Sequence, residues 1–176
     1  MSERITVLYS EDTINARIKE LGEIISRDYA GQSVHLVGVL KGGSFFMCEL
    51  AKRITVPVTI DFISCSSYGD ATESSGAVKL VKDLDSPIEG LNVIVVEDII
   101  DTGRTLNYLM KMFLAHRPAS LKLCTLLDKP ERRVVDTKVD YCGFQIPDEF
   151  IVGFGLDWAQ KYRNLPYIGV IHFDEE

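Results

Sequence analysis

Apolar residues occur along the chain in two alternating patterns. Short, nearly continuous apolar runs are typical of strands buried on both faces, whereas apolar residues spaced by three or four positions are typical of helices with one buried face. The alternation predicts an α/β fold with a mostly parallel central sheet flanked by helices. The strand-like runs are 34–40, 58–63, 93–96 and 121–127, and the helix-like segments are 14–25, 45–52 and 106–114.

The last of these helices is the most regular. Five apolar residues are spaced to lie on one of its faces, and a proline follows its expected end. The five are Leu106, Leu109, Met110, Phe113 and Leu114, and the proline is Pro118.

Other segments of the chain are less regular. Only small and charged residues surround Tyr68 in the polar stretch 66–76, and Val78, Leu80 and Leu84 alternate as a strand returning from that stretch would. Short apolar pieces near the chain ends predict a small cap over the sheet. Because no repeat, linker or low-complexity segment is present, one domain covering 1–176 is expected.

The segment that follows the apolar run Val93–Val96 carries the clearest chemistry. It begins with Glu97 and Asp98 and continues through Asp101 into a turn of hydroxyls and glycine, 102–105. Free amides of such a turn, at the start of a helix, hold an anion such as phosphate, and the acids suit sugar hydroxyls and a divalent metal. A sugar phosphate is therefore the implied ligand. The alternative is an ordinary buried strand and a helix capped by Asp101, but it leaves two carboxylates to be desolvated without a partner.

Composition narrows the classes of function. The formal net charge is −7 and no Lys/Arg cluster offers a basic face, which argues against a nucleic-acid partner. No stretch has the pattern of a signal peptide or a membrane span, so we expect a cytoplasmic protein with no membrane partner. The four cysteines and three histidines lack the spacing of zinc ligands and are expected to be packed or solvent-facing.

Five motifs follow one another in order: LKGGS at 40–44, SSYG at 66–69, EDIIDTG at 97–103, LLDKP at 126–130 and PDEFIVGFGLDWAQKYRNLP at 147–166. Together they resemble the type I phosphoribosyltransferases, and the EDIIDTG wording resembles the hypoxanthine-guanine branch. The resemblance covers nearly the whole chain. It implies the type I phosphoribosyltransferase fold with a small hood, and purine salvage, in which the phosphoribosyl group of phosphoribosyl pyrophosphate is transferred to N9 of hypoxanthine and guanine.

The resemblance also implies where the sugar phosphate and the pyrophosphate bind. Asp101 matches the general base that accepts the N7 proton of the purine. In this family a cis peptide bond often precedes the lysine of the motif that LKGGS resembles, so the resemblance suggests a cis bond at Leu40-Lys41. The pyrophosphate residues are Lys41, Gly42 and Arg163, the Mg²⁺ residues are Glu97, Asp98 and Asp157, and the phosphoribosyl residues are Glu97, Asp98, Asp101, Thr102, Gly103, Arg104 and Thr105.

A third group of residues matches the family's purine site. Lys129 offers only N–H donors, which suit the 6-oxo group of hypoxanthine or guanine and disfavour adenine. Phe150 matches the ring on which the purine stacks, and the backbone of Ile151 would read the pyrimidine edge. Ser67 and Tyr68 match the loop that closes over the site and excludes water.

Three questions stay open at this level. The enzyme could prefer xanthine, and the chain could instead be a regulator that binds phosphoribosyl pyrophosphate without turning it over. Such a regulator would be expected to lose the base or the purine contacts, whereas Asp101, Lys129 and Phe150 are all present. Relatives form dimers or tetramers, so a homodimer or homotetramer is expected.

Overall fold

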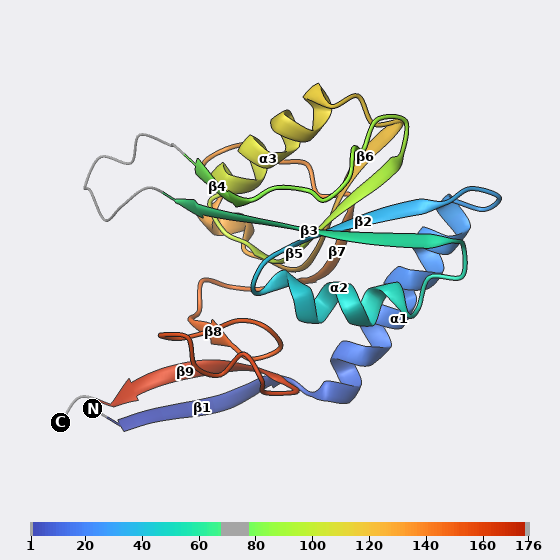
Figure 1. Cartoon of the computed structure of the whole chain (residues 1–176). Helices are drawn as coiled ribbons and strands as arrows, with labels where there is room; N and C mark the ends of the chain where they lie inside the picture. Colours follow the sequence, from blue (N-terminus) through green and yellow to red (C-terminus); the bar gives the residue numbers. More distant parts are fainter. Residues whose placement is uncertain (1, 68–77, 175–176) are drawn as a thin grey trace.

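The structure, a computed structural model, describes residues 2–67 and 78–174. Its strands and helices alternate over most of this length (Figure 1). In chain order they are β1 (Ser2–Tyr9), α1 (Glu11–Asp28), β2 (Val34–Val39), α2 (Gly43–Ala51), β3 (Val58–Ser67), β4 (Val78–Lys82), β5 (Asn92–Ile100), α3 (Arg104–Ala115), β6 (Ser120–Asp128), the 3-10 helix η1 (Pro130–Arg132), β7 (Tyr141–Gln145), β8 (Ile151–Val152) and β9 (Ile168–Asp174).

Six strands form the central sheet in the order β4-β3-β2-β5-β6-β7. All neighbouring pairs are parallel except β3 and β4, which are antiparallel. Helices α1 and α2 cover one face of this sheet and α3 covers the other (Figure 1). The predicted α/β class and mostly parallel sheet are confirmed.

The apolar run of β5 explains how the sheet is buried on both sides. Ile94 and Val96 pack into the cluster formed with α1 and α2, whereas Val93 and Val95 pack into the cluster formed with α3. Successive side chains of a strand point to opposite faces, so a strand in the middle of a three-layer structure needs a continuous apolar run.

A second, smaller sheet is antiparallel and has the strand order β1-β9-β8. Its strands come from the two ends of the described chain, and they lie beside the carboxyl-terminal side of the main sheet (Figure 1). The pattern of apolar residues did not identify β1 as a strand.

Several boundaries differ from the sequence prediction. Strand β5 continues to Ile100, so Glu97 and Asp98 lie within the strand and not after it. Helix α3 begins at Arg104, two residues earlier than expected, and its N-cap is Gly103 with φ 83°, so the alternative in which Asp101 caps the helix is wrong. Leu114 was expected on the buried face but is 60% exposed, because that face is covered only along Leu106, Leu109 and Phe113.

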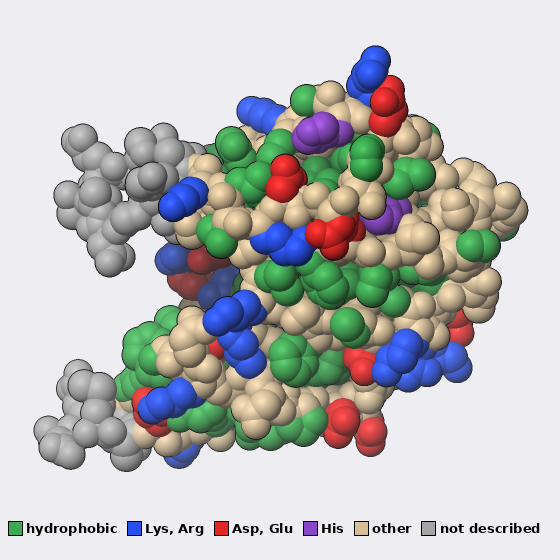
Figure 2. Space-filling model, viewed as in Figure 1, with side chains coloured by type: hydrophobic (Ala, Val, Ile, Leu, Met, Phe, Trp, Pro, Cys, Tyr) green, Lys and Arg blue, Asp and Glu red, His purple; other side chains and the backbone are tan. Residues whose placement is uncertain are grey.

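On the face in Figure 2, Lys and Arg side chains are interspersed with Asp and Glu and form no continuous basic surface. None of the helices in residues 2–67 and 78–174 combines the length and hydropathy needed to cross a bilayer.

Candidate active site

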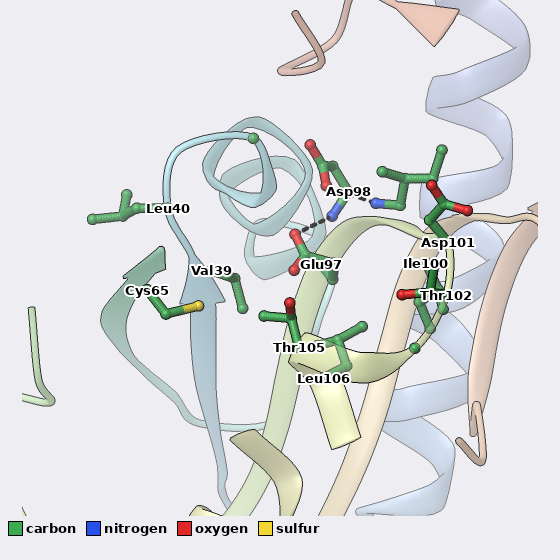
Figure 3. A pocket seen from close by; sticks show the side chains of 13 residues that line it. Val39, Leu40, Cys65, Glu97, Asp98, Ile100, Asp101, Thr102, Thr105 and Leu106 are labelled. Atoms are coloured by element: carbon green, nitrogen blue, oxygen red, sulfur yellow. Dashed lines mark hydrogen bonds between the residues drawn. The ribbon is translucent and has the colours of Figure 1, made fainter. Parts of the chain in front are cut away.

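A cavity of about 310 Å³ lies at the carboxyl ends of β2 and β5. Figure 3 shows side chains from separate elements around it, with Leu40 following β2, Cys65 on β3 and Glu97 on β5. Parallel strands bring their carboxyl ends to one edge, where ligands of α/β folds bind. The lining residues are Val39, Leu40, Gly42, Cys65, Glu97, Asp98, Ile99, Ile100, Asp101, Thr102, Gly103, Thr105 and Leu106.

Glu97 and Asp98 give this cavity its electrostatic character. The Asp98 amide donates to Glu97 Oε1 at 3.0 Å and the Ile99 amide donates to Asp98 Oδ1 at 2.7 Å, as the dashed lines in Figure 3 show. Burial raises the pKa of Glu97 well above its usual range, and the neighbouring Asp98 carboxylate raises it further. Burial also raises the pKa of Asp98, with partial compensation from hydrogen bonds and from Arg163. A cation or hydroxyl donors in the cavity would stabilise the ionised form of both carboxylates.

The turn 101–105 connects β5 to α3 and lines the same cavity. Gly103 has φ 83°, a conformation that glycine adopts without the steric cost of a side chain. The Arg104 amide donates to Thr102 Oγ1 at 3.4 Å, and the Asn107 amide makes the first helical bond to Gly103 O at 2.9 Å. The start of α3 therefore faces the cavity and offers the positive end of a helix dipole to an anion.

The loop after β2 approaches Asp98 of β5 closely at Gly42. The Leu40-Lys41 peptide bond is cis, as the family resemblance suggested. A Cβ atom on Gly42 would collide with the Asp98 carboxylate, and one on Gly155 would collide with Gly42 O. Glycine at these two positions allows the Gly42 backbone to lie against both the Asp98 carboxylate and the backbone of Gly155, which leaves the Lys41-Gly42 loop close to the acids.

Arg163 and Asp157 lie beside this loop as an ion pair. Arg163 Nη2 is 2.7 Å from Asp157 Oδ1, and Arg163 Nη1 donates to Gly155 O at 2.7 Å. Gln160 Oε1 accepts from Lys41 Nζ at 3.1 Å, which ties the same segment to the β2 loop. Four residues predicted for pyrophosphate and metal are thereby gathered beside Glu97 and Asp98, although Asp157, Arg163 and Lys41 do not line the cavity itself.

Comparison with known proteins identifies the family. Residues 7–158 match the model of the phosphoribosyl transferase domain. The chain is 55% identical to a hypoxanthine-guanine phosphoribosyltransferase of Streptococcus mutans, over 96% of this chain and 93% of that protein. The corresponding protein of Streptococcus agalactiae is 58% identical, over 94% of this chain and 92% of its own length.

Solved structures agree. A hypoxanthine-guanine phosphoribosyltransferase of Bacillus anthracis superimposes with a TM-score of 0.91 at 52% identity, covering 97% of this chain and all of its own. A hypoxanthine phosphoribosyltransferase of Staphylococcus aureus gives 0.92 at 47% identity, covering 95% and 91%. The chain belongs to the phosphoribosyl transferase domain family.

In this phosphoribosyltransferase the three predicted purine residues lie outside the cavity. Lys129 is buried at the end of β6, where its Nζ donates to Glu149 O at 2.6 Å and lies 3.4 Å from Asp148 Oδ1. Phe150 is 46% exposed and meets the Trp158 ring edge-on with centroids 5.0 Å apart. Ile151 is buried in β8. An exposed aromatic ring beside an otherwise buried strand is a surface on which a flat ligand can stack.

Asp101 has a partner that the sequence did not reveal. Arg132 Nε donates to Asp101 Oδ1 at 2.9 Å, and Arg132 Nη1 reaches Asp148 Oδ2 at 3.4 Å. The Asp101 carboxylate raises the pKa of Arg132. From the sequence, Arg132 and Arg133 looked like an unassigned basic pair. Their position three and four residues after Lys129 was the available sign that they lie near the site.

The remaining predicted residues are less informative. Arg104 is exposed at the start of α3. Ser67 ends β3, its side chain is not among those described, and Tyr68 lies outside the described residues. Within residues 2–67 and 78–174, no group of three or more His, Cys, Asp or Glu is arranged to hold a metal ion. Glu97 and Asp98 alone would supply too few ligands, so a bound metal would take most of its oxygens from substrate and water.

Proposed function

We propose that the protein transfers the 5-phosphoribosyl group of phosphoribosyl pyrophosphate to N9 of hypoxanthine and guanine, giving IMP or GMP and pyrophosphate. One observation carries the proposal: two carboxylates with raised pKa values and a helix-starting turn of amides and hydroxyls line the same cavity. The names of the relatives from Streptococcus and Bacillus agree with this activity.

The sugar phosphate is assigned to β5 and the turn after it. Amides and hydroxyls of Thr102–Thr105 would bind the 5′-phosphate, with Arg104 contributing its amide and no assigned side-chain role. Glu97 and Asp98 would accept hydrogen bonds from the ribose hydroxyls. These contacts hold the ribose while the bond from C1′ to pyrophosphate breaks and the bond from C1′ to N9 forms.

The leaving pyrophosphate is assigned to the loop after β2. Amides of Lys41 and Gly42, together with the Arg163 guanidinium, would take up the negative charge that develops as pyrophosphate departs. The close approach of Gly42 to the Asp98 carboxylate supports this placement, because a residue without a side chain lets the loop amides lie beside the acids of the cavity.

Mg²⁺ is the proposed cofactor. The oxygen donors Glu97, Asp98 and Asp157 suit a hard cation, and the raised pKa values of the first two indicate a site that lacks sufficient positive charge. When bound, Mg²⁺ would neutralise charge on the pyrophosphate oxygens.

The purine is assigned to the segment around β8. Lys129 would donate to the 6-oxo group, Phe150 would stack on the ring and the backbone of Ile151 would read the pyrimidine edge. Ser67 and Tyr68 would belong to a loop that closes over the site. A xanthine-preferring enzyme would use the same residues, so a product panel with hypoxanthine, guanine, xanthine and adenine decides the base.

Asp101 is the proposed general base for the N7 proton. It lines the cavity at the start of the turn 101–105, and Arg132 Nε lies 2.9 Å from Asp101 Oδ1. Asp101→Asn should lower kcat by about 10²- to 10⁴-fold with little change in thermal stability. Wild-type turnover in this variant would remove the assignment. Tight binding of phosphoribosyl pyrophosphate by the wild-type protein, with no nucleotide formed from any base, would instead favour the non-catalytic regulator.

Three broader expectations accompany this function. We propose that the chain forms one domain, which predicts a single cooperative unfolding transition in calorimetry. We also propose that the protein forms a homodimer or homotetramer, which static light scattering in solution would measure. We further propose a cytoplasmic location, which fractionation of cells would test.

A further inference from the structure

Residues 133–137, here called the supporting segment, contact the turn 101–105, here called the phosphate turn. The cavity is lined by residues 101–103 of the turn but by no residue of the supporting segment. The amides of Val134 and Val135 both donate to Thr102 O, at 3.0 and 3.2 Å. The supporting segment therefore contacts the turn from the side that faces away from the ligand.

Two side chains contact the carbonyl groups on either side of Thr102. Arg133 Nε donates to Asp101 O at 3.3 Å. The Thr137 hydroxyl lies 3.3 Å from Gly103 O and 3.2 Å from Val135 O, so its one hydrogen is shared between these two carbonyls. The N–H and C=O of a trans peptide point in opposite directions. The carbonyls of residues 101, 102 and 103 all face the supporting segment. The amides of residues 102–104 therefore point away from it.

The supporting segment is itself anchored to the central sheet. Arg133 forms an ion pair with Asp128, which ends β6, and only 17% and 9% of the two side chains are exposed. Arg133 Nη1 also donates to Thr137 O at 3.3 Å. The fit is tight, since a Cβ atom on Gly103 would lie 2.8 Å from Thr137 Oγ1 and 2.9 Å from Arg133 Cδ.

We propose that Arg133 and Thr137 are positioning residues that set the affinity for the 5′-phosphate by orienting the amides of the turn, without touching the ligand. This inference rests on the proposed function in one respect, namely that the phosphate binds at 102–105. Because amide donors act on an anion only when they converge on it, a small rotation of the turn weakens every contact together.

Thr137→Val tests the proposal with little change in shape. Losing one hydrogen bond to the turn should raise the dissociation constant of IMP about 3- to 10-fold, as measured by calorimetry, and leave that of inosine, which lacks the phosphate, unchanged. Thr137→Ser keeps the hydroxyl and should bind IMP as the wild type does.

A matched control separates positioning from general destabilisation. Tyr141→Phe also removes a single side-chain hydroxyl, which donates to Asp28 Oδ2 at 2.7 Å outside the site. It should lower the melting temperature without changing the affinity for IMP. Equal affinity of Thr137→Val and wild type for IMP, or equal losses for IMP and inosine, would overturn the proposal.

A variant within the turn tells the two possible failures apart. Thr105 lines the cavity, so Thr105→Val should weaken IMP binding if the phosphate binds there. Weakening by Thr105→Val with no effect of Thr137→Val would leave the phosphate assignment standing and refute the role of the supporting segment. No effect of either variant would refute both.

Discussion

One carboxylate on β3 and a pair of carboxylates on β5 have very different surroundings in the central sheet. Asp61 on β3 is 5% exposed, and its oxygens accept from the Phe62 and Asp85 amides at 2.7 and 2.8 Å, with Lys82 Nζ at 3.7 Å. Glu97 and Asp98 on β5 each accept a hydrogen bond from the backbone amide of the residue that follows. Burial and the charge of Asp98 both raise the pKa of Glu97.

The difference separates a structural role from a functional one. Asp61 has two amides and an ammonium group as partners, so its buried charge is compensated and it joins β3 to the segment after β4. Burial raises the pKa of both Glu97 and Asp98, which means that the folded chain alone does not stabilise their charges. Poorly compensated carboxylates in a cavity indicate that the compensation comes from a ligand.

The largest effect should follow from removing the two cavity charges. The double variant Glu97→Gln with Asp98→Asn should lose about 10²-fold or more in kcat/KM, because the ribose hydroxyls then face neutral amides in place of two charged carboxylates. Its free energy of unfolding, from urea titration, should equal or exceed that of the wild type, since two unfavourably buried charges are gone. A large loss of stability would place these residues with Asp61.

The opposite result is expected at Asp61. Asp61→Asn removes the charge and replaces one acceptor by a donor facing an amide, so it should lower the free energy of unfolding by about 1–3 kcal/mol. The same urea titration measures this change. If kcat/KM at a temperature where the variant is folded fell as far as in the double variant, the distinction between the two groups would be lost.

The smallest effect concerns His35, which lies on β2 and shares a face of the sheet with Asp61. Its Nδ1 is 2.7 Å from Thr59 Oγ1, and its buried Nε2 has no hydrogen-bond partner in the described part of the chain. Burial lowers the pKa of His35, and Asp61 offsets part of that change.

The sign of the resulting pH dependence follows from linkage. The unfolded chain binds a proton at His35 near pH 6.5, while the folded chain still holds it neutral, so stability falls as pH decreases below about 6.5. His35→Gln should flatten this part of a curve of unfolding free energy against pH. An unchanged curve would show that His35 does not contribute.

Much of the fold is predictable because it depends on local periodicity. The run Val93–Val96 has apolar residues on both faces, which predicts a strand covered by helices on two sides, and β5 is such a strand. The end of β5 was not predictable. Glu97 is polar, yet it pairs with Thr125 of β6 and the ladder continues through Ile99 and Ile100, because hydrogen bonding between backbones does not depend on side-chain polarity.

Contacts between residues far apart in the sequence could not be predicted from local patterns either. Strand β1 is stabilised by pairing with β9 at the other end of the chain, and nothing in its own sequence specifies that partner. The ion pair of Arg132 with Asp101 spans 31 positions in the same way. The residues of the phosphate turn, by contrast, are contiguous, so their grouping around one cavity could be predicted from spacing alone.

The central claim is that acids and amides at the end of β5 together hold a ribose phosphate. A crystal structure of the protein with IMP tests it most directly. We predict the phosphate within hydrogen-bond distance of the amides of Thr102–Thr105 and the ribose hydroxyls beside Glu97 and Asp98. A phosphate bound anywhere else on the protein would contradict the account.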